Sequence, residues 1–495
     1  MGTVENESSD LQATSIVIIG GGPGGYEAAL VARRLGADVT LVERSGLGGA
    51  AVLTDVVPSK TLIATADWMT IAERATELGI SLVAPGTPDT SEAPGTAGAG
   101  APQLQPRVDL SVVNRRVRDL ARAQSQDVRA RLEREGVHLV DGSARVASPG
   151  LVVATAPDGT TTDLPCDVVL VATGATPREL PDARPDGRRI LTWTQVYDLQ
   201  TLPEKLVVVG SGVTGAEFAG AYNALGVPVV LVSSRDRVLP NEDADAATLI
   251  EEVFRDRGME VMARSRAVSA TVVGEEPDAH VEVTLADGTV VTGSHVLMAV
   301  GSVPSTRDLG LEEAGVVLSE SGHVQVDRVS RTSVRGIYAA GDCTGTFPLA
   351  SVAAQQGRIA MAHALGDAVV PIRLRTVAAN IFTTPEIATV GYSETALQAQ
   401  SSKYSVTMLP LARNARAKML GMRHGFVKIF FHPDAGVVLG GVVVAPRASE
   451  LIFPIALAVE HRLTVDDVAE AFTVYPSLTG SIAEVARMGH HRRLD

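Results

Sequence analysis

Two segments of the chain carry the same glycine-rich pattern, and this repetition constrains the fold more than any other feature. The segment "SIVIIGGGPGGYEAALVARRLGADVTLVERS" begins at Ser15, and "KLVVVGSGVTGAEFAGAYNALGVPVVLVSS" begins at Lys205. Each predicts an apolar strand, a turn of the form G-x-G-x-x-G, a helix and a second strand. The first glycine makes the bend, the second lets a pyrophosphate approach the backbone, and the third lets helix and strand pack closely. The sequence therefore predicts two dinucleotide-binding βαβ units, 190 residues apart (Gly20 to Gly210).

The first unit has every part that an adenine dinucleotide requires. Gly20, Gly22 and Gly25 form the turn, and Pro23 opens the helix whose N-terminus faces the phosphates. Glu43 ends the second strand, where a carboxylate can hold a ribose. A glycine-rich turn alone also occurs without any ligand. The strand, the helix and the acid together favour a nucleotide site.

The second unit repeats the glycines but lacks the acid. Its turn contains Gly210, Gly212 and Gly215, and its second strand ends in Ser234 and Arg235. Without a carboxylate there is no repulsion against a 2′-phosphate, and Arg235 or Arg237 could pair with one. The pattern predicts that NADPH is accepted and leaves NADH open. The alternative is that both arginines are only solvated surface charges.

Composition excludes several other classes of protein. The net charge of −14 argues against a nucleic-acid partner or an anionic membrane surface. The two cysteines, Cys166 and Cys343, cannot form a disulfide framework or a metal-ligand cluster, so we expect no metal and a reducing compartment. Residues 1–13 are polar and acidic, and no run of 18 apolar residues occurs. We therefore expect a disordered tail, no membrane insertion and a cytoplasmic location.

Three further segments predict buried strands that end in glycine turns: "DVVLVATGATP" (167–177), "SHVLMAVGSVPS" (294–305) and "GIYAAGDCTG" (336–345). Residues 84–106 are rich in Ala, Gly, Pro, Ser and Thr, which predicts a flexible surface loop. A helix is predicted from Pro58 to about Leu78. After about residue 371 alternating strands and hairpins predict a separate α+β domain.

Together these segments resemble the pyridine nucleotide–disulfide oxidoreductases, which include lipoamide dehydrogenase and glutathione reductase. The resemblance extends from about Ser15 to Arg487. It implies an α/β fold with two Rossmann-like dinucleotide-binding domains plus a C-terminal α+β dimerisation domain, and hence a homodimer. The expected domains are FAD-binding (14–185, with the flexible loop 84–106), NAD(P)-binding (186–299), a return to the central FAD domain (300–370) and dimerisation (371–495).

The resemblance also assigns roles to residues. Asp342 matches the acid that binds the ribityl chain of FAD, although a helix N-cap is the alternative. Lys60 matches a lysine beside flavin N5 and Glu217 its partner carboxylate, although a structural salt bridge between domains is the alternative. Further cofactor contacts are expected at Thr173, Gly174, Gly301 and Gly341.

The chain departs from the family where thiol chemistry takes place. Family members of the disulfide type read G-G-x-C-x-x-x-x-C-x-P-S-K, and "GGAAVLTDVVPSK" here places Ala51 and Val56 at the two cysteine positions. The family's C-terminal H-P-x-x-x-E becomes "YPSLTG", with Tyr475 for His and Gly480 for Glu. A phenol is a poor general base near neutral pH but can donate a hydrogen bond. Dithiol exchange is therefore excluded.

These features are similar to the cysteine-poor NAD(P)H:quinone reductase branch of the family. They imply an FAD-dependent NAD(P)H:quinone oxidoreductase, in which electrons pass from NAD(P)H through FAD to a quinone or similar small acceptor, with Tyr475 from the other subunit near the quinone. Two alternatives stay open. One is a soluble pyridine nucleotide transhydrogenase, and the other is a non-catalytic flavoprotein scaffold.

Overall fold

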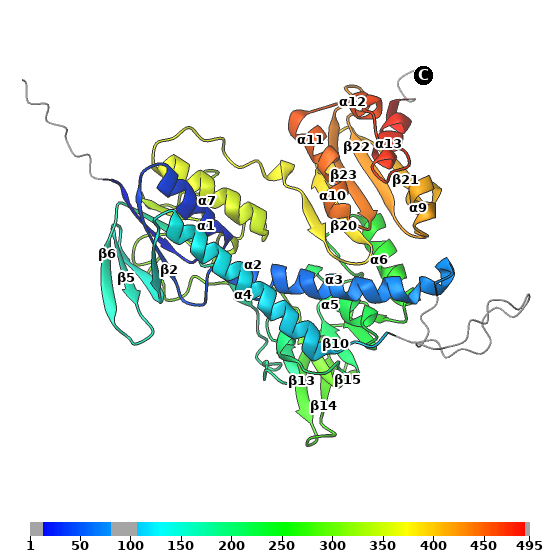
Figure 1. Ribbon diagram of the computed structural model, residues 1–495, viewed down its shortest axis with the longest axis horizontal. Coiled ribbons are helices and arrows are strands. Elements are labelled where there is room, and N and C mark those ends of the chain that lie inside the picture. The colour runs from blue at the N-terminus through cyan, green and yellow to red at the C-terminus, as the bar shows by residue number, and fades with distance from the viewer. Residues whose placement is uncertain (1–12, 81–105, 491–495) are drawn as a thin grey trace, which may run out of the picture. The chain divides into compact units, whose positions relative to one another are not determined.

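The computed structural model describes residues 13–80 and 106–490, which divide into two compact units (Figure 1). Unit 1 contains the described residues up to Pro58, together with Arg118–Arg178 and Gly301–Val377. Unit 2 contains the described residues of Ser59–Val117, Glu179–Val300 and everything described from Ala378 onward. Residues 1–12 of the predicted tail and 84–105 of the predicted loop lie outside the described residues.

The centre of unit 1 is a five-stranded parallel sheet in the order β18-β7-β1-β2-β3. In its middle strand, Ile18 pairs with Leu41 on one side and Leu170 on the other, and all three are fully buried. Such strands are continuously apolar because parallel sheets are covered on both faces. The strands are β1 (Ser15–Ile19), β2 (Asp38–Glu43), β3 (His138–Asp141), β7 (Val168–Val171) and β18 (Ile337–Ala339).

Helices α1 (Pro23–Arg34) and α7 (Ala350–Ala364) lie side by side in unit 1 (Figure 1). They cross so closely that a Cβ at Gly357 would overlap the carbonyl oxygen of Gly24. The remaining elements of unit 1 are α2 (Gly49–Leu53), η3 (Asp342–Thr344), η4 (Leu374–Thr376), the antiparallel sheet β4 (Ser143–Ser148), β5 (Leu151–Thr155) and β6 (Thr161–Pro165), and the paired strands β8 (Ala175–Pro177) and β17 (Ser302–Pro304).

Unit 2 contains a second parallel sheet, in the order β12-β11-β10-β16-β9, which repeats the arrangement in unit 1. A three-stranded antiparallel sheet, β13-β14-β15, accompanies it. The elements of this part are β9 (Ile190–Thr192), η2 (Val196–Asp198), β10 (Leu206–Val209), α5 (Val213–Ala224), β11 (Val229–Val232), α6 (Ala244–Asp256), β12 (Glu260–Met262), β13 (Ala267–Val273), β14 (His280–Leu285), β15 (Val290–Gly293) and β16 (His295–Met298).

The third large sheet, also in unit 2, is antiparallel in the order β19-β20-β23-β22-β21. Its helices complete the α+β architecture that the sequence predicts for this region. The elements are β19 (Ala379–Ile381), β20 (Glu386–Gly391), α8 (Glu394–Ala399), β21 (Ser405–Pro410), η5 (Leu411–Arg413), α9 (Ala415–Met419), β22 (Phe426–Phe431), β23 (Val438–Ala445), α10 (Ala448–Leu451), α11 (Phe453–His461), α12 (Val465–Glu470) and α13 (Gly480–His490).

Two long helices, α3 (Val56–Glu73) and α4 (Leu110–Arg134), contain positions where the chain passes between the units. The predicted start of α3 at Pro58 is wrong, because the helix begins two residues earlier and passes into a short 3-10 helix, η1 (Ala75–Leu78). A proline is tolerated at the third position because the first N–H groups of a helix have no acceptor within it. Among the described helices, none is long and apolar enough to cross a membrane.

Candidate active site

The first glycine-rich turn joins β1 to α1 and leaves the start of the helix accessible. Gly20 has a backbone φ of 103°, and a Cβ there would overlap the carbonyl oxygen of Ala172. A Cβ at Gly25 would overlap the carbonyl oxygen of Gly20, so glycine lets α1 approach the turn. A Cβ at Gly22 would meet nothing within 4 Å. With Pro23 as the first helical residue, the N-terminus of α1 is open to a negatively charged group.

Glu43 lies at the end of β2 and is bound to this turn. Its Oε2 accepts a hydrogen bond from the N–H of Gly21 (2.7 Å), and its Oε1 accepts one from the N–H of Ser45 (2.6 Å). A carboxylate has about four acceptor sites. Lone pairs therefore remain for ribose hydroxyls while the backbone bonds fix the orientation of the carboxylate.

Helix α2 begins directly beside the same turn. The N–H of Gly48 donates to the carbonyl oxygen of Gly21 (2.8 Å), and a Cβ at Gly49 would lie 2.9 Å from the Cα of Gly22. Ala51 therefore lies one helical turn or less from the phosphate-binding turn, on a helix whose position is set by backbone contact. At this position the chain offers a methyl group.

Both cysteines are free and buried. Burial raises the pKa of the Cys166 thiol and of the Cys343 thiol to about 11 each. The Cys343 thiol donates to the carbonyl oxygen of Ala340 (3.3 Å), and Thr173 and Gly174 lie beside it and lower its pKa slightly. Neither thiol is ionised at neutral pH.

Asp342 lines a cavity of about 370 Å³ in unit 1. Burial raises the pKa of Asp342, and His323, which lines the same cavity, lowers it by a smaller amount. Gly341, rather than Asp342, is the N-cap of the short helix η3, and no side-chain cap bond is present there. The helix N-cap alternative for Asp342 is therefore wrong, and the half-buried carboxyl faces a cavity that is large enough for part of a ligand.

A residue that the sequence analysis missed holds the Asp342 loop in place. The fully buried amide of Gln356, on α7, accepts from the N–H of Gly341 (2.8 Å) and donates to Thr344 Oγ1 (3.3 Å). Thr344 in turn donates to the carbonyl oxygen of Gly341 (2.8 Å). Nothing in the local pattern of a glutamine on a helix indicates this role, because the contact spans 15 residues.

The second turn, between β10 and α5, repeats the geometry of the first. Gly210 has a φ of 113°, Gly215 approaches its carbonyl oxygen, and a Cβ at Gly212 would meet nothing within 4 Å. Ser233 stands where Glu43 stands in the first unit, and its hydroxyl bonds the hydroxyl of Ser211 (2.7 Å). Gly301, another predicted contact, belongs to unit 1, where its carbonyl oxygen accepts from Arg178 N–H (2.9 Å).

Three arginines lie around the end of β11. Ser234 and Arg235 are exposed and Arg237 is half-buried, so these side chains are accessible to a ligand. The sequence analysis missed Arg264, whose N–H donates to the carbonyl oxygen of Arg235 (2.7 Å) from the loop after β12. Arg264 has a left-handed φ of 55°, which is uncommon for a non-glycine residue and often marks a functional position. In the described part of the chain these arginines form no ion pair.

Lys60 and Glu217 form the ion pair that the sequence predicts. Lys60 Nζ on α3 lies 2.7 Å from Glu217 Oε2 on α5, and the Glu217 side chain is only 4% exposed. Glu217 Oε1 accepts from the N–H of Phe382 (2.8 Å), and the ammonium lies 5.0 Å from the centre of the Phe382 ring. The carboxylate thus fixes a cation whose side chain is 24% exposed and so can still reach a ligand.

Tyr475 lies apart from this pair. Its side chain is 84% exposed, between the exposed Val474 and a cis bond to Pro476. Among the described residues its hydroxyl has no hydrogen-bond partner. Gly480, at the predicted glutamate position, begins α13 and is capped by the hydroxyl of Ser477 (3.0 Å). The structure therefore does not bring Tyr475 to Lys60 within one chain.

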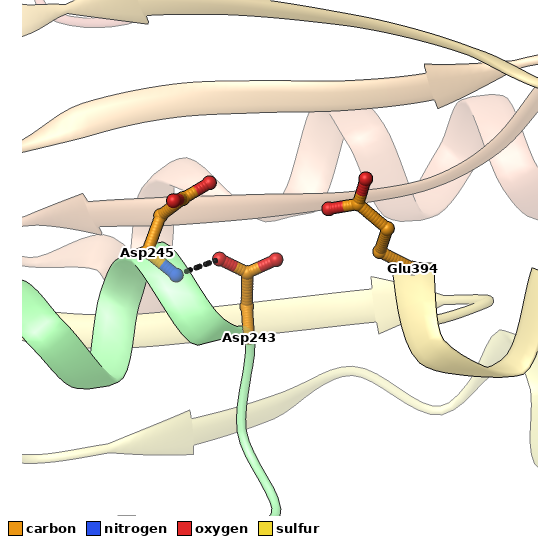
Figure 2. A group of neighbouring side chains, drawn as sticks. All are labelled: Asp243, Asp245 and Glu394. Carbon is orange, nitrogen blue, oxygen red and sulfur yellow. Dashed lines mark hydrogen bonds between the residues drawn. The ribbon is translucent and has the colours of Figure 1, made fainter. Parts of the chain in front are cut away.

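A cluster of three carboxylates, Asp243, Asp245 and Glu394, lies elsewhere in unit 2 (Figure 2). The buried ammonium of Lys428 lies among them, at 3.0, 2.8 and 2.7 Å respectively. Burial alone would lower the pKa of Lys428, but the three carboxylates outweigh it and raise the pKa. The cluster therefore already holds a cation, and we assign it a structural role.

The residues of unit 1 fit an adenine dinucleotide with a polar chain. The open N-terminus of α1 suits a pyrophosphate, Glu43 suits a ribose, and the cavity at Asp342 suits a hydroxylated chain. FAD contains all three groups. The second loop, in unit 2, suits a second dinucleotide.

Comparison with known proteins agrees with this geometry. The family described as pyridine nucleotide-disulphide oxidoreductase matches residues 14–357, and the dimerisation domain of that family matches residues 377–486. An NAD(P)H dehydrogenase (quinone) of Mycobacterium tuberculosis is 54% identical over 483 residues, which are 96% of this chain and 93% of the relative. A dihydrolipoyl dehydrogenase of Chlorobaculum parvum is 31% identical over 487 residues, 97% of this chain and 98% of the relative.

Solved structures show the same similarity. LpdA of Mycobacterium tuberculosis matches with a TM-score of 0.87 at 53% identity, over 96% of this chain and 99% of LpdA. The HOCl-induced flavoprotein disulfide reductase RclA of Escherichia coli matches with a TM-score of 0.80 at 21% identity, over 96% and 99% of the two chains. At that identity the second match shows the fold alone.

Proposed function

Because the chain belongs to the pyridine nucleotide-disulphide oxidoreductase family, we propose that it is an FAD-dependent NAD(P)H:quinone oxidoreductase that works without a redox-active disulfide. Proteins of this family use FAD and NAD(P)H. The similarity to a relative named NAD(P)H dehydrogenase (quinone), at 54% identity, supports the quinone as acceptor.

One observation carries the proposal: both dinucleotide loops are intact, whereas Ala51 and Val56 occupy the positions of a thiol pair. A thiol relay needs a thiolate, and the two cysteines present are buried with pKa values near 11. The acceptor is therefore a small molecule that takes electrons without a protein thiol. A quinone is flat and apolar, and Ala51 and Val56 offer it apolar side chains at the two positions where disulfide members of the family have thiols.

In the proposed reaction we assign a role to each residue of the site. When bound, FAD supplies an acceptor for the hydride of NAD(P)H and a donor of two electrons to the quinone. The turns at Gly22 and Gly212 hold the pyrophosphates, and Asp342 holds the ribityl hydroxyls. Glu217 orients Lys60, and Lys60 presents a fixed cation where negative charge develops on reduction.

We further propose a homodimer formed through the dimerisation domain. Phe472, Val474 and Tyr475 form one strongly exposed apolar segment before α13. Contact with a second copy would cover this segment and would place the Tyr475 hydroxyl as a hydrogen-bond donor for a quinone oxygen.

The test is an anaerobic stopped-flow absorbance experiment on the FAD-loaded protein. NADPH should bleach the flavin, and menadione should restore its colour faster than thio-NAD⁺ does. Treatment with N-ethylmaleimide should leave both steps unchanged. Flavin that NADPH cannot reduce would favour the scaffold alternative, and faster reoxidation by thio-NAD⁺ would favour the transhydrogenase.

Introducing cysteines at the two positions where the family has them should not produce thiol chemistry. In the variant Ala51→Cys/Val56→Cys, we expect NAD⁺-linked oxidation of dihydrolipoamide to stay at or below about one-hundredth of the rate of a dihydrolipoyl dehydrogenase. The reason is that Tyr475 and Gly480 supply no acid–base pair, a contribution of roughly 10²–10⁴ in rate. Thiol titration before and after reduction verifies that the new pair forms. Substantial activity would contradict our interpretation of the C-terminal segment.

The arginines near β11 should set the preference for NADPH. Replacing Arg264 or Arg235 with glutamine should weaken NADPH binding about three- to tenfold, because an exposed charge pair with the 2′-phosphate is lost. NADH binding should not change. Arg266→Gln is the matched control, since Arg266 is also exposed but its carbonyl oxygen bonds Ala286 instead. Dissociation constants from fluorescence titration provide the measurement, and an equal loss for both nucleotides would contradict a 2′-phosphate contact.

A further inference from the structure

Lys428 is a buried lysine that joins two parts of unit 2. It lies on β22 of the antiparallel sheet, and its side chain is only 4% exposed. Of the three carboxylates around its ammonium, Glu394 begins α8 in the same α+β part, whereas Asp243 and Asp245 lie at the start of α6 (Figure 2). Helix α6 belongs to the part of the chain that contains the second dinucleotide loop. One buried cation therefore ties these two parts together.

Asp243 uses each of its carboxylate oxygens for a different contact. Its Oδ1 caps α6 by accepting from the N–H groups of Asp245 (3.1 Å) and Ala246 (3.2 Å). Its Oδ2 lies 3.0 Å from Lys428 Nζ, and its side chain is also only 4% exposed. A buried ion pair adds little stability compared with apolar residues of the same size, but its charge-assisted bonds are directional. The pair with Lys428 therefore fixes where α6 begins.

The loop between β11 and α6, residues 233–243, is held by bonds to its neighbours on both sides. Glu251, on α6, accepts through Oε2 from the N–H of Val238 (3.1 Å). The N–H of Leu239 donates to the carbonyl oxygen of Ser211, which lies in the second glycine-rich turn (2.8 Å). The position of α6 therefore sets the position of this loop relative to the turn.

Arg235 and Arg237, which are expected to meet a 2′-phosphate, extend from this loop. Their carbonyl oxygens both accept from the hydroxyl of the fully buried Ser233, at 3.2 and 3.4 Å. The side chain of Arg235 is exposed and that of Arg237 is half-buried. Both cations thus start from a backbone that is fixed, and the part of that backbone nearest to α6 depends on Lys428.

We propose that Lys428 is a positioning residue for NADPH. By fixing the start of α6, it holds Arg235 and Arg237 where they meet the 2′-phosphate, an assignment that rests on the proposed function. NADH lacks this phosphate and depends on the glycine-rich turn, which is built by β10 and α5. The affinity for NADPH should therefore depend on Lys428, and the affinity for NADH should not.

The experiment compares the dissociation constants of NADPH and NADH, from fluorescence titration of the FAD-loaded protein. Lys428→Met should weaken NADPH binding about three- to tenfold, the loss expected for an exposed charge pair with a phosphate, and should change NADH binding less than about twofold. Asp243→Asn should have the same selective effect, because asparagine still caps a helix but does not form an ion pair with the ammonium. This second variant keeps the test decisive if Lys428→Met does not fold.

Glu394→Gln is the matched control. It removes a bond of 2.7 Å to the same ammonium but leaves both contacts of Lys428 with α6. Its melting temperature should fall, as that of Asp243→Asn does, while the ratio of the two dissociation constants stays at the wild-type value. A lysine with a structural role only would change this ratio in both variants or in neither, and either result would overturn the inference.

A triple variant tests whether Lys428 acts through the arginines. In Arg235→Gln/Arg237→Gln the contacts with the 2′-phosphate are already lost, so adding Lys428→Met should cause no further loss of NADPH affinity. A full further loss would overturn the inference, as would equal losses for NADPH and NADH in Lys428→Met alone. Wild-type protein that binds neither nucleotide would contradict the proposed function as well. A wild-type preference that persists in Lys428→Met and Asp243→Asn would contradict this inference alone.

Discussion

Replacing Lys60 with methionine is expected to slow the reduction of bound flavin by NADPH about 10²-fold, because the role proposed for Lys60 is that of a preorganised charge that stabilises the negative charge of the reduced flavin. The Lys60 ammonium is held at 2.7 Å from Glu217 and above the Phe382 ring, so it does not have to reorganise during the reaction. The observed rate of flavin bleaching at saturating NADPH, in stopped-flow absorbance, provides the measurement. An unchanged rate would leave Lys60 with a structural role only.

A double variant separates the effect of the lost charge on the rate from its effect on stability. Lys60→Met removes the cation that lies 2.7 Å from the Glu217 carboxylate, whose side chain is only 4% exposed, so the free energy of unfolding should fall by about 3 kcal/mol. In Lys60→Met/Glu217→Gln the buried charge is gone, and stability should largely return while the slow rate persists. Recovery of the rate together with stability would show that the single variant was slow because it was distorted.

Much of the fold was predictable because its signals are local. The apolar strand, the glycine turn and the helix follow one another within some 30 residues, and the predicted family and fold class are confirmed. Both predicted first strands, β1 and β10, are continuously apolar and are the middle strands of the two parallel sheets. The roles of the site residues in binding ligands stay predictions; the structure shows that Glu43 is bound to the first turn, that Asp342 lines a cavity and that Lys60 is paired with Glu217.

The missed residues depend on contacts between distant parts of the chain. Gln356, on α7, holds the Asp342 loop, and Arg264, in the loop after β12, bonds the backbone of Arg235 beyond the end of β11. Neither residue has a pattern in its own neighbourhood that indicates this contact. The start of α3 was misjudged because Pro58 is acceptable at several positions of a first turn, and the sequence does not distinguish among them.

Asp342 should govern the affinity for FAD, and should do so in a pH-dependent way. Burial raises the pKa of Asp342 above the ordinary value of 3.8, which means that the cavity disfavours its charged form when no ligand is present. A ribityl hydroxyl donates a hydrogen bond to the ionised carboxylate and so favours the charged form. Binding of FAD is therefore linked to loss of a proton from Asp342.

Because FAD binding is linked to loss of a proton, the affinity for FAD should depend on pH. The affinity of the apoprotein for FAD should be constant at pH values above the raised pKa of Asp342 and should fall as the pH drops through it. His323, the other titratable group lining the cavity, opposes the effect only in part, because its charge lowers that pKa by less than burial raises it. Asp342→Asn should remove the part of the pH dependence that comes from Asp342. His323→Gln should raise the pH at which the affinity for FAD begins to decrease.

Loss of the Asp342 carboxylate should weaken FAD binding at neutral pH. A hydrogen bond to a charged group contributes about 1.5–3 kcal/mol, so Asp342→Ala should raise the dissociation constant of FAD roughly 10- to 150-fold. Asp342→Asn keeps an acceptor and should lose less. The change in flavin fluorescence during titration of the apoprotein gives both constants. Gln356→Ala should weaken FAD binding without altering its pH dependence, because Gln356 only positions the Asp342 loop. If Asp342→Ala bound FAD as wild type does, the cavity at Asp342 would not be where the ribityl chain lies.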